Sequence, residues 1–206
     1  EMLDHISLKI EGVDELVKLV IDDGSKDNTV KVSKEHGAIV LSNSTQKRLA
    51  YSFQKAVAKA LELGADYAVN IDADLQFNPK QIPDLLKPII EGKADFVISD
   101  RFTDENAGKK RRPENMPVGK YLSNKLGAWV VGILSKQKFN DVTCGFRAYN
   151  RKALLEININ STYTYTQESL QVLAMKKLNI KSMPVEIRYF KGRKSRVVQS
   201  FIGFLL

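Results

Sequence analysis

The stretch AVNIDADLQFNP, residues 68–79, decides the fold class that this sequence predicts. It opens with a short apolar run, which is typical of a buried strand when a turn signal follows it. Asn78 and Pro79 then form a helix start, with asparagine as the cap and proline in the first turn. Asp72 and Asp74 are therefore expected at the carboxyl end of a strand, where open α/β sheets bind their ligands.

Asp72 and Asp74 form a candidate metal site, because they place two hard oxygen ligands one residue apart. Mg²⁺ is usually held by one or two carboxylates together with substrate phosphates, and Mn²⁺ suits the same ligands. A solvated turn is the alternative interpretation, since aspartates are also common in turns. The pattern alone leaves both interpretations open.

A second acidic strand end lies earlier in the chain. Residues 16–21, LVKLVI, are typical of a strand and are followed by the turn DDGS at 22–25, in which Ser25 is the expected cap of a helix over 26–36. We expect both strands in one sheet, where their paired aspartates would cluster negative charge that a cation or a donor-rich ligand offsets. A βα turn shaped by Gly24 is the other interpretation.

Strand and helix patterns alternate along the rest of the chain. Helical patterns cover 49–61, 78–90, 121–135 and 167–178, and strand-like runs cover 67–71, 96–99 and 180–188. Pro184 places the last of these strands at an edge of the sheet. The alternation predicts an α/β fold with a mainly parallel central sheet flanked by helices.

Composition restricts the class of protein. With 206 residues, of which 43% are hydrophobic, the chain can bury a core as one domain. Its one cysteine excludes an internal disulfide, and its two histidines, His5 and His36, are too far apart in sequence to suggest a zinc site. No run of about 18 apolar residues is present, so no bilayer-spanning segment is expected within this sequence.

Positive charge is concentrated towards the carboxyl end. Residues 176–206 hold eight lysines or arginines and one acid, a net charge of +7 out of the chain's +8. The apolar run FIGFLL follows at 201–206, and basic residues next to an apolar run favour an anionic membrane surface over nucleic acid. An apolar stripe within 121–135 either packs on the core or contacts a membrane. The basic loop at 103–119 is either solvated or a lid.

Six segments, taken in order, resemble the family 2 glycosyltransferases, and within them the polyprenyl-phosphate (dolichyl-phosphate) sugar synthases. They are VIDDGS at 20–25, DADLQ at 72–76, SDRF at 99–102, DVTCGFRA at 141–148, QE at 167–168 and GRKS at 192–195. The resemblance implies a GT-A fold, with a catalytic domain over 1–196 and a membrane-proximal segment beginning at 197–206. The family's first strand, with its Pro-x-Tyr-Asn-Glu turn, has no counterpart here, so an N-terminal strand is expected to be missing.

The resemblance also implies a reaction, in which a sugar moves with inversion from a UDP- or GDP-sugar to a polyprenyl phosphate on the cytoplasmic side of the cell or ER membrane. Four sets of residues are implied, for the donor, the metal, catalysis and the acceptor. The nucleotide-sugar is expected at Asp22, Asp23 and Asp72, and Mg²⁺ or Mn²⁺ at Asp72, Asp74 and Gln76. The catalytic residues are expected to be Asp74, Arg101 and Glu168, and the acceptor phosphate is expected at Arg101, Arg147, Arg193, Lys194 and Ser195.

The acceptor separates two enzymatic hypotheses. A lipid phosphate is already anionic and needs no base, and in that group we expect Glu168 to orient arginines. A saccharide hydroxyl needs a carboxylate base, for which Glu168 is the candidate. A non-enzymatic nucleic-acid module would explain the charge but not the acidic strand ends, so we expect no nucleic-acid partner. The sequence names neither the sugar, the lipid length nor the oligomeric state.

Overall fold

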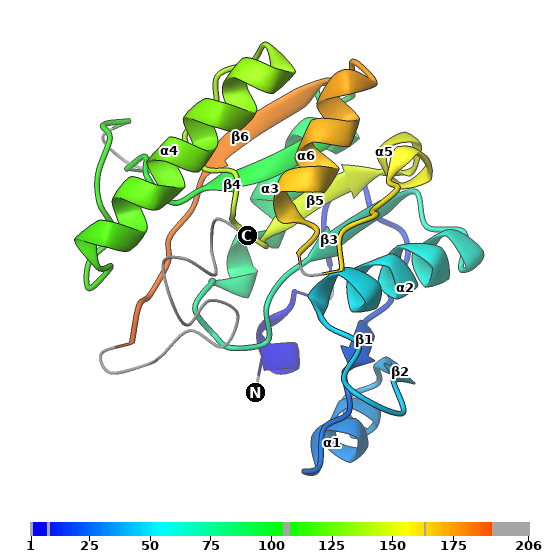
Figure 1. The fold of residues 1–206 in the computed structure, drawn as a ribbon. Helices are drawn as coiled ribbons and strands as arrows, with labels where there is room; N and C mark the ends of the chain where they lie inside the picture. Colours follow the sequence, from blue (N-terminus) through cyan, green and yellow to red (C-terminus); the bar gives the residue numbers. More distant parts are fainter. Residues whose placement is uncertain (1, 8, 105–107, 163, 191–206) are drawn as a thin grey trace.

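The chain forms two β-sheets with helices packed around them (Figure 1). This computed structural model describes residues 2–7, 9–104, 108–162 and 164–190. β1 (Leu19–Asp22) and β2 (Ile39–Ser42) pair in parallel as the smaller sheet. The larger sheet has the strand order β3-β5-β4-β6, with bounds Tyr67–Asn70 for β3, Phe96–Asp100 for β4, Arg147–Asn150 for β5 and Ile180–Pro184 for β6.

Three strands of the larger sheet point the same way. β4 and β6 pair in parallel, while β5 runs antiparallel to both β3 and β4. The predicted α/β class is therefore confirmed, and the strand directions are mainly parallel, but two of the three neighbouring pairs are antiparallel because β5 is inserted between β3 and β4. β6 lies at the edge, as Pro184 predicted.

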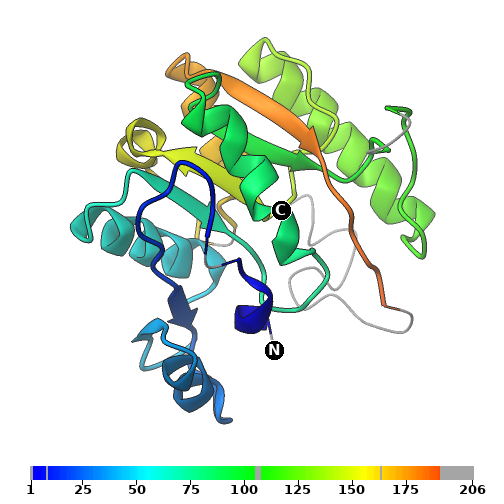
Figure 2. The ribbon, with the colours of Figure 1, turned by 180° about the vertical axis from the view of Figure 1, so that it is seen from behind.

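The expectation that the two acidic strand ends belong to one sheet is wrong for the described residues. β1 pairs with β2, whereas β3 pairs with β5 in the other sheet. In both views β1, β2 and α1 (Thr29–Glu35) stand apart from the larger sheet (Figures 1 and 2). Helix α2 (Leu49–Glu62) joins the two parts, because it contacts β1 and also packs Phe53 and Val57 into the core of the larger sheet.

Helices cover both faces of the larger sheet. α2, α4, α5 and α6 lie on one face and α3 on the other (Figures 1 and 2). Their bounds are Ile82–Ile90 for α3, Val118–Ser135 for α4, Arg151–Glu156 for α5 and Thr166–Met175 for α6, with short 3₁₀ turns at Met2–His5 and Pro79–Gln81. This arrangement buries the sheet on both sides, as in other layered α/β folds.

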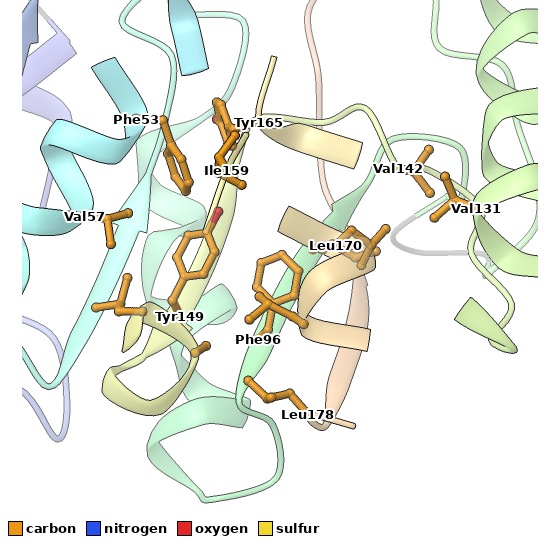
Figure 3. Packing of buried hydrophobic residues seen from close by; sticks show 14 of the residues in the cluster. Phe53, Val57, Phe96, Val131, Val142, Tyr149, Ile159, Tyr165, Leu170 and Leu178 are labelled. Atoms are coloured by element: carbon orange, nitrogen blue, oxygen red, sulfur yellow. The ribbon is translucent and has the colours of Figure 1, made fainter. Parts of the chain in front are cut away.

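The period of two along the strands divides the core into two clusters. Phe96 and Tyr149 face α2, α5 and α6, and their rings stack with centroids 4.8 Å apart (Figure 3). Val97 and Ala148, the next residues along β4 and β5, pack instead with α3. Because successive side chains of a strand point to opposite faces, each strand contributes to both clusters.

Helix starts follow the predicted chemistry in one place and depart from it in another. The Asn78 side chain accepts a hydrogen bond from the Lys80 N–H at 3.1 Å, and Pro79 opens the turn that leads into α3. α1, however, begins at Thr29, after the predicted position. The N-cap position is Asn28 and not Ser25, whose N–H donates to the Asp22 carboxylate at 3.0 Å in the preceding turn.

Candidate active site at the Asp72–Asp74 turn

The turn after β3 presents two carboxylates in a fixed backbone. Asp72 is exposed and Asp74 is half-buried. The Gln76 N–H donates to Asp74 Oδ1 at 3.0 Å, and Leu75 takes the left-handed conformation with φ 58°. The backbone carbonyl of Gln76, which we had expected near the metal, accepts from the Arg188 N–H at 2.9 Å. The segment after β6 therefore holds the far side of the turn.

Asp72 lies against Gly145, and the missing side chain of Gly145 makes room for it. A Cβ at this position would lie 3.3 Å from Asp72 Oδ2 and 3.3 Å from the Tyr165 hydroxyl oxygen. Both distances are tighter than most real Cβ contacts, so a larger residue would push the carboxylate or the ring aside. The glycine of the DVTCGFRA segment therefore sets where Asp72 sits.

Tyr165 is a site residue that the sequence did not predict. Its hydroxyl accepts from Asn70 Nδ2 at 2.6 Å, and its ring stacks on Phe53 with centroids 3.8 Å apart (Figure 3). Burial raises the pKa of Tyr165 well above its ordinary value, and the nearby Asp72 charge adds to the effect. The phenol is thus a neutral, fixed neighbour of the Asp72 carboxylate. Its one sequence signal is its place two residues before the matched pair Gln167–Glu168.

Asp22 and Asp23 both hold local structure. The hydrogen bond from Ser25 lowers the pKa of the buried Asp22. Burial by itself would raise the pKa of Asp23, but the Lys47 N–H at 2.9 Å and Asn43 Nδ2 at 2.8 Å keep it below its ordinary value. Asp23 therefore ties the end of β1 to the start of α2. The nucleotide-binding role of both aspartates stays a prediction.

A cleft of about 490 Å³ lies beside the start of α2, and neither Asp72 nor Asp74 lines it. One wall holds exposed Lys47 and Arg48, and the other is the loop at 159–162. Glu168 fixes that loop, because its two carboxylate oxygens accept from the Asn160 and Ser161 N–H groups at 2.7 and 2.9 Å. Both Glu168 oxygens thus contact backbone, and the predicted role of Glu168 in orienting arginines stays a prediction.

Arg101 is buried in an ion pair, and its contact with the acceptor phosphate stays a prediction. Its Nε donates to Asp141 Oδ2 at 2.5 Å and its Nη2 to Asp141 Oδ1 at 2.8 Å, a bidentate geometry. Thr143 and Tyr189 accept two further hydrogen bonds. Although burial opposes both charges, the pair raises the pKa of Arg101 and lowers the pKa of Asp141. The fork that would clamp a phosphate is occupied by Asp141.

Arg147 is also a structural residue in this fold. It is fully buried, and its guanidinium donates to the carbonyls of Val142, Cys144 and Thr166 at 2.7–2.8 Å. A fourth bond goes to Ser169 Oγ at 2.9 Å. These contacts hold the DVTCGFRA loop onto α6 and leave no exposed guanidinium surface, so they do not support the contact with an acceptor phosphate, which stays a prediction.

The remaining predicted acceptor residues, Arg193, Lys194 and Ser195, lie outside the described residues, as does the predicted membrane-proximal segment at 197–206. Among the described helices, none is both long and apolar enough to cross a bilayer.

The Asp72–Asp74 pair fits a divalent cation of the Mg²⁺ type. In the described part of the chain no group of three or more His, Cys, Asp or Glu residues is arranged to hold a metal. Two oxygen ligands at an accessible turn are instead what Mg²⁺ takes when substrate phosphates complete its shell. The absence of sulfur or imidazole donors at this turn argues against zinc.

Comparison with known proteins identifies the family. The model described as "Glycosyl transferase family 2" matches residues 14–158, which include both acidic turns and the DVTCGFRA segment. The chain is a family 2 glycosyltransferase. The resemblance seen in its short motifs therefore extends over most of its length.

Two relatives of this family 2 glycosyltransferase act on lipid phosphates, according to their names. The UDP-N-acetylglucosamine–dolichyl-phosphate N-acetylglucosaminyltransferase of Methanococcus voltae is 29% identical over 206 residues, which cover 90% of this chain and 80% of that protein. The undecaprenyl-phosphate mannosyltransferase of Micrococcus luteus is 29% identical over 156 residues, which cover 73% of this chain and 61% of that protein.

A solved structure shares the fold. Glucosyl-3-phosphoglycerate synthase from Mycobacterium tuberculosis, crystallised with Mn²⁺, UDP and glucosyl-3-phosphoglycerate, matches with a TM-score of 0.67 at 20% sequence identity. The match covers 93% of this chain and 66% of that chain. The family 2 glycosyltransferase thus has the predicted GT-A fold.

Proposed function

We propose that this glycosyltransferase moves a sugar, with inversion, from a UDP- or GDP-sugar to a polyprenyl phosphate on the cytoplasmic side of the cell or ER membrane. The observation that carries the proposal is the Asp72–Asp74 turn, held by Gly145, Tyr165 and Gln76 in a family 2 fold. The relatives named above transfer different sugars but share a polyprenyl phosphate acceptor. That shared acceptor supports the lipid class and leaves the sugar open.

On the donor side, Asp72 and Asp74 would hold Mg²⁺ or Mn²⁺. The ion, when bound, supplies a Lewis acid for the charge that develops on the leaving nucleoside diphosphate. The residues themselves orient the site, since the Gln76 N–H fixes the Asp74 carboxylate and Gly145 admits Asp72. Tyr165, which is buried and stacks on Phe53, lies next to Gly145 on the same side as Asp72.

The state of Glu168 supports a phosphate acceptor. Both of its oxygens already accept backbone N–H groups, which hold the carboxylate on the 159–162 loop. A phosphate oxygen is anionic before it attacks, so no residue needs to remove a proton. Exposed Lys47 and Arg48 on the opposite wall of the cleft add positive charge that favours a phosphate-bearing substrate.

A screen of donors against acceptors tests the proposal. Radiolabelled UDP- and GDP-sugars are incubated with a polyprenyl phosphate, the matching polyprenol or a free saccharide, with Mn²⁺ or with excess chelator. We expect one donor to give a labelled lipid product in the organic phase, and only when the phosphate acceptor and the metal are both present. Transfer to the saccharide alone would overturn the acceptor, and full transfer in chelator would overturn the metal.

A further inference from the structure

Helix α4 carries a row of large apolar side chains that face solvent. Trp129, Leu134 and Leu122 are 64, 63 and 59% exposed, and three more residues continue the row. We define the α4 apolar face as the six residues Leu122, Leu126, Trp129, Val130, Ile133 and Leu134. Soluble proteins seldom expose so many large apolar side chains next to one another, and such patches usually mark an interaction site.

The α4 apolar face points away from the protein core. Asn124, Ala128 and Val131 are the buried residues of α4, and Val131 faces Val142 in the core (Figure 3). At about 100° per residue these positions lie on the opposite side of the helix from Leu122 and Trp129. Both views place α4 on the outside of the molecule (Figures 1 and 2). Core packing, one of the two predicted roles of this stripe, is therefore performed by the other side of the helix.

Basic residues outnumber acidic ones around the α4 apolar face. Residues 116–140 contain four lysines and no aspartate or glutamate. Just before the helix, the three basic residues Lys109, Lys110 and Arg112 are exposed, together with one acid, Glu114. A second copy of this chain would bring lysines against lysines if two α4 faces met. An anionic surface, in contrast, would attract the flanking lysines while the apolar side chains left water.

Contacts also connect α4 to the candidate active site. The Lys120 ammonium lies 5.1 Å from the centre of the Tyr189 ring, in the first turn of the helix. The residue before Tyr189 is Arg188, whose N–H donates to the Gln76 carbonyl in the Asp72–Asp74 turn. A surface that binds α4 would thus lie next to the segment that supports the metal site.

We propose that the α4 apolar face docks on the surface of an anionic phospholipid bilayer, with the helix lying parallel to that surface. This inference rests on the proposed function, because a polyprenyl phosphate acceptor is held in such a bilayer. It deepens that function by assigning the contact to one helix. With 18 residues, α4 is about 27 Å long, which suits a helix lying in the interface with only its side chains inserted.

Trp129 supplies the test, because it is the one tryptophan of the chain and lies on the proposed surface. Its fluorescence is measured with vesicles of phosphatidylcholine alone or mixed with phosphatidylglycerol. We expect a blue shift and quenching by brominated acyl chains with the anionic vesicles, and at least tenfold weaker binding to the neutral ones. Absence of quenching by the brominated lipids would overturn the proposal, as would equal binding to both kinds of vesicle.

Two variants keep Trp129 and separate this surface from the rest of the chain. The double variant Leu126→Glu/Ile133→Glu should lose at least tenfold in vesicle affinity. Leu155→Glu, which changes an equally exposed leucine on α5, should bind as the wild type does. Full binding by the double variant would assign membrane contact to another part of the chain. Analytical ultracentrifugation without vesicles tests for a dimer. If the wild type and Leu155→Glu were dimers and the double variant a monomer, the α4 apolar face would bind a second copy and the proposal would be overturned.

Activity in detergent distinguishes failure of this inference from failure of the proposed function. Transfer to a short-chain polyprenyl phosphate in micelles does not need a bilayer, so the double variant should keep it. If the wild type transfers sugar in micelles but Trp129 does not enter vesicles, the docking surface is wrong and the function stands. If brominated lipids in the vesicles quench Trp129 but the wild type transfers no sugar to a phosphate acceptor, the proposed function is wrong.

Discussion

Gly145 shows how one missing side chain can make room for a candidate metal-binding carboxylate. Its Cα faces Asp72 and Tyr165, and the 3.3 Å distances from an added Cβ leave little room for either neighbour to stay in place. Arg101 and Arg147 show the reverse, in which large side chains of matched motifs are buried and serve the fold. At the scale of single residues, therefore, motif membership alone does not separate residues that touch substrate from residues that support them.

Gly145→Ala should lower transfer activity by about 10-fold to 100-fold, because displacement of a positioning group by a fraction of an ångström to 1 Å commonly has effects of that size. The fold should persist, since the added methyl meets a side chain and a hydroxyl that can shift. The measurement is the Mn²⁺ concentration needed for half-maximal transfer, which should rise. Gly127→Ala on α4 is the matched control, because its nearest neighbour would be 4.0 Å away. Equal metal dependence in both variants would contradict the role of Gly145.

Arg101→Ala should destabilise the protein by roughly 3–5 kcal/mol, because removing one partner leaves the buried Asp141 charge unpaired. Urea unfolding measures this loss. The double variant Arg101→Met/Asp141→Leu should recover part of it, since an apolar pair of similar volume leaves no buried charge. If Arg101→Ala unfolded like the wild type and instead lost affinity for the phosphate acceptor, that result would contradict the structural role and support the predicted acceptor role of Arg101.

At the scale of elements, α2 is the part that joins the two sheets. Asp23 at the end of β1 accepts hydrogen bonds from the backbone at the start of α2, and Phe53 one turn later stacks on Tyr165 beside Asp72. The two acidic turns are therefore coupled through one helix, although their strands lie in different sheets.

Asp23→Asn should weaken this junction and reduce the dependence of stability on pH. The pKa of Asp23 is lowered in the folded state, whereas an unfolded aspartate titrates near about 3.9. The stabilising effect of its charge is thus fully present above about pH 5 and is lost as the pH falls through and below the unfolded value. The difference between the urea midpoints at neutral pH and at about pH 3.5 should be smaller in the variant than in the wild type. An unchanged difference between the two midpoints would rule out this role.

Elements with local signals were predictable from the sequence, and those that depend on distant partners were not. Asn78 and Pro79 predicted a helix start because the cap lies within two residues of the N–H it binds. β5 was missed because Arg-Ala-Tyr-Asn carries no β-branched residue, and its neighbours β3 and β4 supply the pairing. The burial of Arg101 depends on Asp141, forty residues away, so no local pattern could indicate that the guanidinium was already paired.

At the scale of the whole molecule, helices cover both faces of the larger sheet. Cys144 is buried in the hydrophobic cluster between the sheet and α3. Burial raises the pKa of this thiol to about 12. Because the thiolate is the reactive form, Cys144 reports on opening of the core.

Cys144 should react with a disulfide reagent at pH 8 only as fast as the protein unfolds. Full and rapid reaction is expected in urea, and a rate lower by several orders of magnitude in buffer. Labelling is followed by absorbance. Arg101→Ala should accelerate it, since that variant lowers the stability of the same core. Rapid labelling of the native wild-type protein would show that the DVTCGFRA loop opens independently of the rest.

The most direct measurement of the central claim compares two acceptors in one vesicle. Polyprenyl phosphate and polyprenol of equal chain length are mixed in anionic vesicles with a labelled nucleotide-sugar and Mn²⁺, and each product is quantified by mass. The wild type should glycosylate the phosphate alone, and Asp74→Asn should lose most of this activity while keeping the wild-type unfolding midpoint. Asp84→Asn, an exposed aspartate on α3, should behave as the wild type. Transfer to the polyprenol, or full activity in Asp74→Asn, would contradict a metal-assisted transfer to a lipid phosphate at this turn.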